Sequence, residues 1–155
     1  MTSDHTLSLT LAAASDVVYA AIASPEGLRR WWTAGAEGSD QLHGVFRLTF
    51  SPGHWTAMRI DMLEPGREVR WSCVGQHEPG FTPTDEWVST TVSFCLEPTP
   101  RGDTVLHFAH HGLAELECNG LCRRGWNFYI GHSLKALVET GHGTPDTRSA
   151  DRVLT

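Results

Sequence analysis

RRGWNFYIGHSLKALVET, residues 123–140, is the stretch that decides the fold of this chain. Its apolar residues recur at intervals of three and four, which predicts an uninterrupted helix with one apolar stripe. The stripe consists of Trp126, Tyr129, Ile130, Ser133, Leu134, Leu137 and Val138. A strand-like run at residues 104–111 and a turn at Gly112 precede this helix. Because almost every other regular segment is typical of a strand, we expect the helix to lie on the concave face of an antiparallel sheet.

One strand and two short helices open the chain. The strand spans residues 7–11, where Leu alternates with Ser and Thr, and the helices span residues 15–23 and 25–32. Ser24 followed by Pro25 is typical of a helix start. Further strands are expected at residues 42–50, 55–63, 68–74, 87–97 and 104–111. The predicted fold is therefore α+β, a curved antiparallel sheet of about six strands wrapped around a long C-terminal helix.

Alternation along these strands predicts which side chains face the helix. The inward set is Phe46, Leu48, Phe50, Met58, Ile60, Met62, Val69, Trp71, Cys73, Leu106, Phe108 and His110. The alternate positions carry residues that suit water, such as Arg59, Asp61 and Arg70. One face of the sheet is therefore expected to be apolar. Large aromatic and Met side chains on such a face are common both in ordinary cores and in adaptable pockets.

The composition indicates one domain without a nucleic-acid or membrane partner. At 155 residues, 40% of them apolar, the chain can build one core, so we assign residues 1–145 to a single domain and residues 146–155 to a flexible tail. A net charge of −6 with scattered basic residues argues against binding a phosphate backbone. No apolar run approaches the roughly 18 residues of a membrane span, and the first residues lack the features of a signal peptide. We therefore expect a cytoplasmic protein.

Five segments follow one another along the chain: SPEGLRRWW at 24–32, TVSFCLEP at 91–98, TVLHFAHHG at 104–112, GW at 125–126 and SLKALVETG at 133–141. With the order of the elements, they resemble the START-like, or SRPBCC, superfamily. Within it they are most similar to the AHSA1-like branch, named after the C-terminal domain of the activator of the ninety-kilodalton heat-shock-protein ATPase. The resemblance implies a helix-grip fold, as in Bet v 1-like proteins. It also implies an apolar cavity between sheet and helix, with no cofactor required by the fold.

The resemblance and the inward-facing residues favour a small soluble binding protein that holds a hydrophobic small molecule in this cavity. The expected lining is Trp32, Phe46, Phe50, Met58, Trp71, Cys73, His110, Trp126, Tyr129 and Ile130. One alternative is an enzyme of the cyclase, aromatase or hydrolase type that acts on an apolar or polyketide-like substrate in the same cavity. Another is a stress-related protein-interaction module. A homodimer is also compatible with the sequence, since Val153 and Leu154 could pack on a second subunit.

His110 and Tyr129 are the candidates for an enzymatic role. An imidazole facing an apolar cavity could carry a proton, and the Tyr129 hydroxyl could donate a hydrogen bond to a ligand. The alternative for His110 is a core histidine whose ring is satisfied by a backbone carbonyl.

Cys118 and Cys122, with three histidines close by in sequence, contain ligand types suited to zinc. No second paired motif accompanies them, so we predict no metal site and interpret the cysteines as small apolar residues. Residues 76–86 and 112–119 form long connectors, and we expect a ligand to enter between them, near Trp31 and Trp32. If Trp32 instead plugs this opening, side chains fill the cavity.

Overall fold

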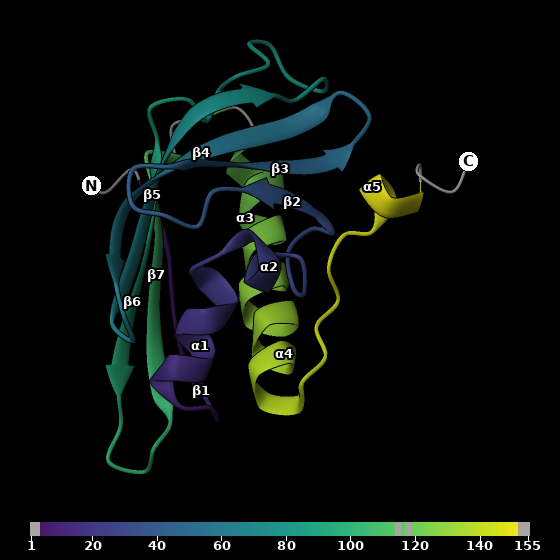
Figure 1. Cartoon of the computed structure of the whole chain (residues 1–155). Coiled ribbons are helices and arrows are strands. Elements are labelled where there is room, and N and C mark those ends of the chain that lie inside the picture. Colours follow the sequence, from purple (N-terminus) through teal and green to yellow (C-terminus); the bar gives the residue numbers. More distant parts are fainter. Residues whose placement is uncertain (1–3, 114–115, 117–118, 152–155) are drawn as a thin grey trace.

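Seven antiparallel strands form one curved sheet in the order β1-β7-β6-β5-β4-β3-β2 (Figure 1). The structure is a computed structural model and describes residues 4–113, 116 and 119–151. The strands are β1 (His5–Leu11), β2 (Gly35–Gly38), β3 (Val45–Ser51), β4 (His54–Glu64), β5 (Glu68–His77), β6 (Thr91–Pro98) and β7 (Thr104–His111). The helices are α1 (Ser15–Ile22), α2 (Pro25–Leu28), α3 (Asn119–Phe128), η2 (Tyr129–Leu134), α4 (Lys135–Thr140) and α5 (Arg148–Asp151). The α+β helix-grip prediction is confirmed.

The sheet has one strand more than the six predicted. β2 is only four residues long and contains two glycines, Gly35 and Gly38, so it has little alternation that a sequence pattern could reveal. It pairs with β3 at the edge of the sheet. β5 also runs three residues beyond its predicted end, to His77. This extension carries Gln76 to the end of the sheet, where the site described below is formed.

The long C-terminal helix is continuous, but its middle is wider than an α-helix. Tyr129–Leu134 forms a π-helical segment between α3 and α4, a feature that the regular spacing of the sequence does not indicate. The predicted stripe is nevertheless confirmed, because Trp126, Ile130, Ser133, Leu134 and Leu137 are all buried. The helix ends at Gly141, whose φ of 92° closes the last turn in a left-handed conformation that glycine adopts without strain.

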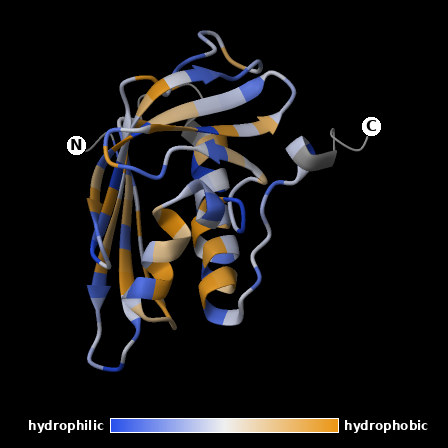
Figure 2. Cartoon of the chain, in the orientation of Figure 1, coloured by the Kyte–Doolittle hydropathy of each residue, from blue (hydrophilic) through white to orange (hydrophobic). Residues whose placement is uncertain are grey.

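The predicted inward parity holds for β3, β5 and β7, where every residue predicted to face inward is buried, and fails at one residue of β4. A β-bulge lies between Ile60 and Met62, so Met62 pairs with Arg70 on the hydrated face. Leu63 then pairs with Val69 and packs against the core in its place. The prediction that Met62 faces inward is therefore wrong, since the bulge shifts the alternation by one residue. Figure 2 shows the hydrophobic residues alternating with hydrophilic ones along the strands and concentrated in α1 and α4.

Aromatic side chains fill the space between the sheet and the long helix. Trp32 stacks on Trp31 and on Trp71, with ring centroids 5.8 Å and 6.0 Å apart. Trp126 brings the helix into this cluster, with its ring 4.8 Å from Trp32 and 4.6 Å from Phe108. The centre of the grip is therefore packed with rings, as in the alternative in which Trp32 closes the cavity. Any room for a ligand therefore lies at one end of the space between the sheet and the long helix.

The segment that follows the long helix lies against the rest of the chain. The Asp146 N–H donates to the Trp32 carbonyl over 2.8 Å, and the Ala34 N–H donates to the Asp146 carbonyl over 2.9 Å. α5 then contacts β3 (Figure 1). For residues 146–151 the structure thus differs from the free tail that the sequence predicts, because these backbone bonds join the segment to the residues after α2. Val153 and Leu154 lie outside the described residues.

Candidate functional site

An open cleft of about 510 Å³ lies at the end of the grip, between the sheet and α3. β4 and β5 supply one wall, and the connector after β5 and the segment after α4 complete it. Five aromatic residues line it: Trp32, Phe50, Trp87, Trp126 and Tyr129. Polar side chains lie among them at His54, Thr56, Gln76, Glu78, Arg124, Asp146 and Arg148. The remaining lining residues are Leu121, Cys122 and Gly125.

Four of the ten predicted ligand-binding residues line this cleft, namely Trp32, Phe50, Trp126 and Tyr129. The other six lie in the core or in the sheet beneath it: Phe46, Met58, Trp71, Cys73, His110 and Ile130. Five of them lie on strands and share the inward parity, Ile130 lies in the π-helical segment, and none of the six lines the cleft. Parity identifies the inner face of the sheet without telling which part of that face is covered. Contact of these six with a ligand therefore stays a prediction.

His110 is held within the core by its neighbours. Its Nδ1 atom lies 3.0 Å from the Trp126 Nε1 donor, and its Nε2 atom lies 2.8 Å from the Thr90 hydroxyl oxygen. The ring of Trp87 packs edge-on against it, with centroids 4.5 Å apart. Burial, with a smaller contribution from His111, lowers the pKa of His110 from 6.5 to about 3. The imidazole is therefore neutral, and both of its ring nitrogens have hydrogen-bond partners. It lies beneath the cleft and positions Trp126, which lines the cleft.

Tyr129, the other catalytic candidate, does line the cleft. It is the first residue of the π-helical segment, and burial raises the pKa of its hydroxyl above the ordinary value of 10.0. The phenol therefore stays protonated at neutral pH and can donate a hydrogen bond into the cleft.

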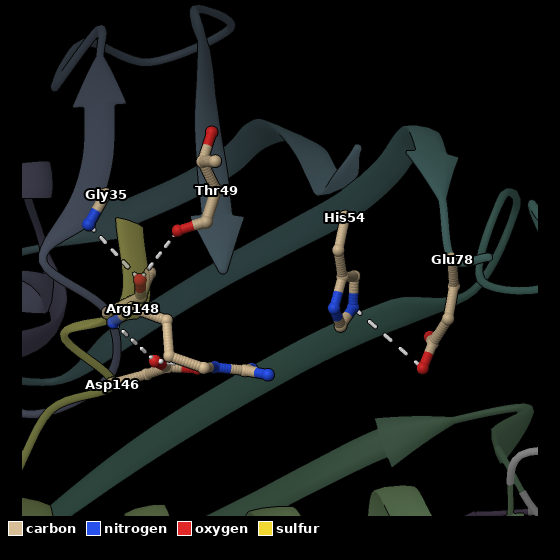
Figure 3. Close-up of polar contacts among 7 residues, drawn as sticks. Gly35, Thr49, His54, Glu78, Asp146 and Arg148 are labelled. Atoms are coloured by element: carbon tan, nitrogen blue, oxygen red, sulfur yellow. Dashed lines mark hydrogen bonds and ion pairs between the residues drawn. The ribbon is translucent and has the colours of Figure 1, made fainter. Parts of the chain in front are cut away.

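His54 and Glu78 extend toward one another across the cleft wall (Figure 3). The His54 Nε2 atom is 3.9 Å from a Glu78 carboxylate oxygen. Burial, then Arg148, lowers the pKa of His54, whereas burial, then Glu86, raises the pKa of Glu78. His54 is therefore neutral at pH 7 and gives the Glu78 carboxylate little charge compensation.

Asp146 and Arg148 form a closed ion pair at the other side of the cleft (Figure 3). The Arg148 guanidinium donates to both carboxylate oxygens, with Nη2 at 2.6 Å and Nε at 3.0 Å. Burial alone would raise the pKa of Asp146, but the hydrogen bonds from Arg148 outweigh it and the net shift is downward. The pair is thus a neutral, internally satisfied unit.

The connector after β5 is attached to the sheet by Gln76. The Trp87 N–H donates to the Gln76 side-chain oxygen over 2.8 Å, deep in the structure. Within the connector, the Glu78 N–H donates to the Thr84 carbonyl over 2.7 Å. These bonds position Trp87 and Glu78, neither of which the sequence analysis selected. For Glu78 the signal is the length and Pro-Gly content of residues 76–86, which predicts an entrance without indicating which side chains form it. Trp87 lies at the start of the strand predicted at residues 87–97, but β6 begins only at Thr91, so Trp87 belongs to the connector.

The structure shows no metal centre within residues 4–113, 116 and 119–151, where no group of three or more His, Cys, Asp or Glu side chains could hold an ion. Cys122 lies in the cleft wall, and Cys118 falls outside the described residues. No helix in the described part of the chain is both long and apolar enough to cross a membrane.

Solved structures of other proteins share this fold, among them the following three. The Aha1 dimer from Colwellia psychrerythraea has a TM-score of 0.75 and 24% sequence identity, over 90% of this chain and 98% of that chain. CV1439 from Chromobacterium violaceum has a TM-score of 0.68 and 24% identity, over 88% of this chain and 97% of that one. DynU16, from the dynemicin biosynthetic locus, has a TM-score of 0.69 and 19% identity, over 96% of this chain. This chain matches only 52% of DynU16.

The sequence itself matches a known family over most of its length. No curated protein matches it. The family model described as Activator of Hsp90 ATPase homolog 1-like protein matches residues 12–139. That range includes both short helices after β1, six of the seven strands completely, and the long helix as far as α4. The chain therefore belongs to the family of Activator of Hsp90 ATPase homolog 1-like proteins.

Proposed function

We propose that this protein binds a hydrophobic small molecule in the cleft between the sheet and the C-terminal helix. The observation that supports the proposal is the aromatic surface of a cleft of about 510 Å³, which includes Trp32, Phe50, Trp87, Trp126 and Tyr129. Ligand sites of this size are typically apolar with a few polar groups that orient the ligand. The cleft has this composition, and its aromatic rings gain from burial against an apolar ligand.

An enzyme acting on an apolar substrate is a second candidate, and a specific observation favours it. His54, Glu78 and Tyr129 place three titratable side chains in the cleft wall. Each could carry or donate a proton, whereas His110 lies below the surface and has both ring nitrogens bonded. A catalytic role would therefore show as loss of turnover in Tyr129→Phe with ligand affinity retained.

A homodimer is proposed on a separate observation. The Colwellia psychrerythraea protein named above is a dimer, and Leu121 and Phe128 of α3 are 52% and 44% exposed here. Light scattering after size-exclusion chromatography measures the molecular mass in solution and so tests the oligomeric state directly. A single monomer mass at high micromolar concentration would overturn the dimer. The predicted cytoplasmic localisation is tested by cell fractionation.

Gly125 offers a sharp test of the binding function. It lines the cleft, and a Cβ atom added there would meet no atom within 4 Å outside its own helix turn, so Gly125→Leu places a bulky side chain at the cleft without a clash at its Cβ. Gly131 lies on the same helix, is exposed outside the cleft, and has the same open surroundings, which makes Gly131→Leu the matched control. Both changes replace a helical glycine with a better helix former.

The experiment measures the melting temperature of the three proteins with a panel of aromatic and lipid-like compounds. A ligand that binds only the folded protein raises the melting temperature. We expect shifts for the unmodified protein and Gly131→Leu, and none for Gly125→Leu. Absence of any shift in the unmodified protein, or equal shifts in both variants, would overturn binding in this cleft.

A further inference from the structure

We propose that the ligand of this cleft is a hydrophobic amine, whose ammonium group binds the Glu78 carboxylate while its apolar part contacts the aromatic wall. This inference rests on the proposed function and names its ligand class. It is carried by a largely buried carboxylate that forms no ion pair with a Lys or Arg of the described residues and that lines the cleft together with aromatic rings.

Glu78 is the residue next to the end of β5, and its side chain is only 15% exposed. The polar side-chain atoms that contact it are uncharged, namely the His54 ring nitrogen at 3.9 Å and the Gln76 amide nitrogen at 3.4 Å, and the charge that acts on it from Glu86 is of the same sign. Among the described residues, no Lys or Arg forms an ion pair with it. A carboxylate removed from water without a cation is unfavourable, and a ligand cation would relieve that cost.

The two arginines of the cleft leave this carboxylate uncompensated. Arg148 directs its guanidinium to Asp146, with three donor contacts of 2.6–3.0 Å, so its positive charge is already neutralised. Arg124 also lines the cleft, from an exposed position on α3, and forms no ion pair with Glu78. Of the two carboxylates that line the cleft, Glu78 is therefore the one without an arginine partner among the described residues. An anionic head group would meet repulsion there, and a neutral one would leave the carboxylate unpaired.

The aromatic wall favours a cation as well. Trp32, Trp87, Trp126 and Tyr129 line the same space as Glu78. The face of an indole or phenol ring is electron-rich and attracts an ammonium group, most strongly when water is excluded. A carboxylate beside several such rings is a combination that recognises organic cations, whereas the rings alone would serve any apolar ligand.

The test uses three probes with one skeleton: naphthylmethylamine, naphthylmethanol and naphthoic acid. Their dissociation constants are measured by isothermal titration calorimetry at neutral pH and low salt. We expect the amine to bind about tenfold more tightly than the alcohol, and the acid most weakly, because one desolvated charge pair is worth about this factor. Glu78→Gln should bring amine and alcohol to near parity. Asp85→Asn should keep the preference, because Asp85 is exposed in the same connector and does not line the cleft.

The outcomes separate this inference from the proposed function. Equal affinity for amine and alcohol, or tightest binding of the acid, would overturn the amine and leave apolar binding intact. Absence of binding by all three probes would overturn both. If Glu78→Gln fails to fold by circular dichroism, Glu78→Asp replaces it. The shorter carboxylate should weaken the amine preference, and an unchanged preference would overturn the role of Glu78.

Discussion

The Trp126 Nε1–H donates to His110 Nδ1 over 3.0 Å, and this bond determines the tautomer of the histidine. Because an indole nitrogen can only donate, Nδ1 must carry the lone pair and the neutral ring must carry its proton on Nε2. Nε2 then donates to the Thr90 hydroxyl oxygen at 2.8 Å, and that hydroxyl donates to the Trp87 carbonyl at 2.6 Å. The long helix, β7 and the connector after β5 are thereby joined through one neutral imidazole.

This chain of hydrogen bonds through the neutral His110 predicts a loss of protein stability in mild acid. Burial lowers the pKa of His110 from 6.5 to about 3, so between these values the unfolded chain binds a proton that the folded protein does not. The contribution of His110 to the free energy of unfolding should therefore be complete above pH 6.5, and it should be lost as the pH is lowered toward 3. Urea denaturation at about pH 7 and about pH 5 should show a loss of about 2 kcal/mol from this group.

His110→Gln is the variant that checks this assignment, because an amide can accept from Trp126 and donate to Thr90 without titrating. It should reduce the difference between the two pH values. Some dependence should remain, since burial also lowers the pKa of His5 and His54. A variant with the same pH dependence as the unmodified protein would contradict the role of His110.

The regular parts of this fold could be predicted because their chemistry is periodic. Phe46, Trp71 and Phe108 face inward as the alternation along their strands predicts, and the stripe containing Trp126 faces the sheet. Prediction failed where the backbone departs from regular geometry, as at the bulge before Met62 and in the π-helical turn that begins at Tyr129. Neither departure requires a characteristic residue, so neither leaves a pattern in the sequence.

The cleft was predicted less well, since its polar residues come from segments far apart in the chain. His54, Glu78 and Asp146 belong to the start of β4, the connector after β5 and the segment before α5. No motif spacing links them. Four of the five aromatic residues of the cleft were among the predicted lining and Trp87 was not, and the aromatic residues that line the cleft and those that fill the core are of the same types.

Trp32→Ala should be among the most destabilising changes in the chain. The indole is 3% exposed and lies within 6.0 Å, between ring centroids, of Trp31, Trp71, Phe50 and Trp126. Removing it leaves a cavity between the sheet and the helix, at a cost of about 3–5 kcal/mol in the free energy of unfolding. Chemical denaturation measures this cost.

Trp55→Ala is the control for that measurement. Trp55 is partly exposed, and its ring contacts the Arg47 guanidinium at 4.2 Å. Its removal should cost about 1 kcal/mol, since an exposed cation–π contact contributes little and no closed cavity results. Equal losses for the two variants would show that the cluster around Trp32 is not the centre of the core.

Gln76→Ala should loosen the connector that carries Glu78 and Trp87. The Gln76 side-chain oxygen accepts the buried Trp87 N–H, and without it that donor has no partner, at a cost of about 1–3 kcal/mol. Hydrogen exchange of the Trp87 amide should accelerate. Gln41→Ala, at an exposed position, should leave both stability and exchange unchanged. Unchanged protection of the Trp87 amide in Gln76→Ala would contradict this anchoring.

Ser133→Ala tests how the long helix holds the segment that follows it. Ser133 is fully buried in the π-helical turn, where its hydroxyl donates to the Trp31 carbonyl over 2.6 Å and accepts the Thr144 N–H over 2.8 Å. Alanine would leave both backbone groups without this partner, so we expect a loss of about 1–3 kcal/mol in the free energy of unfolding. Ser8→Ala, on the exposed face of β1, should change it by less than about 0.5 kcal/mol.

The position of this hydroxyl also predicts where the effect appears. Thr144 is two residues before Asp146, whose backbone bonds to Trp32 and Ala34 hold the cleft wall. Loss of the Ser133 bond should therefore accelerate amide exchange at Thr144 and Asp146 more than in β6 or β7, because only the first two depend on this attachment. If exchange accelerates equally throughout the chain, Ser133 stabilises the core as a whole and the segment is held by its other contacts.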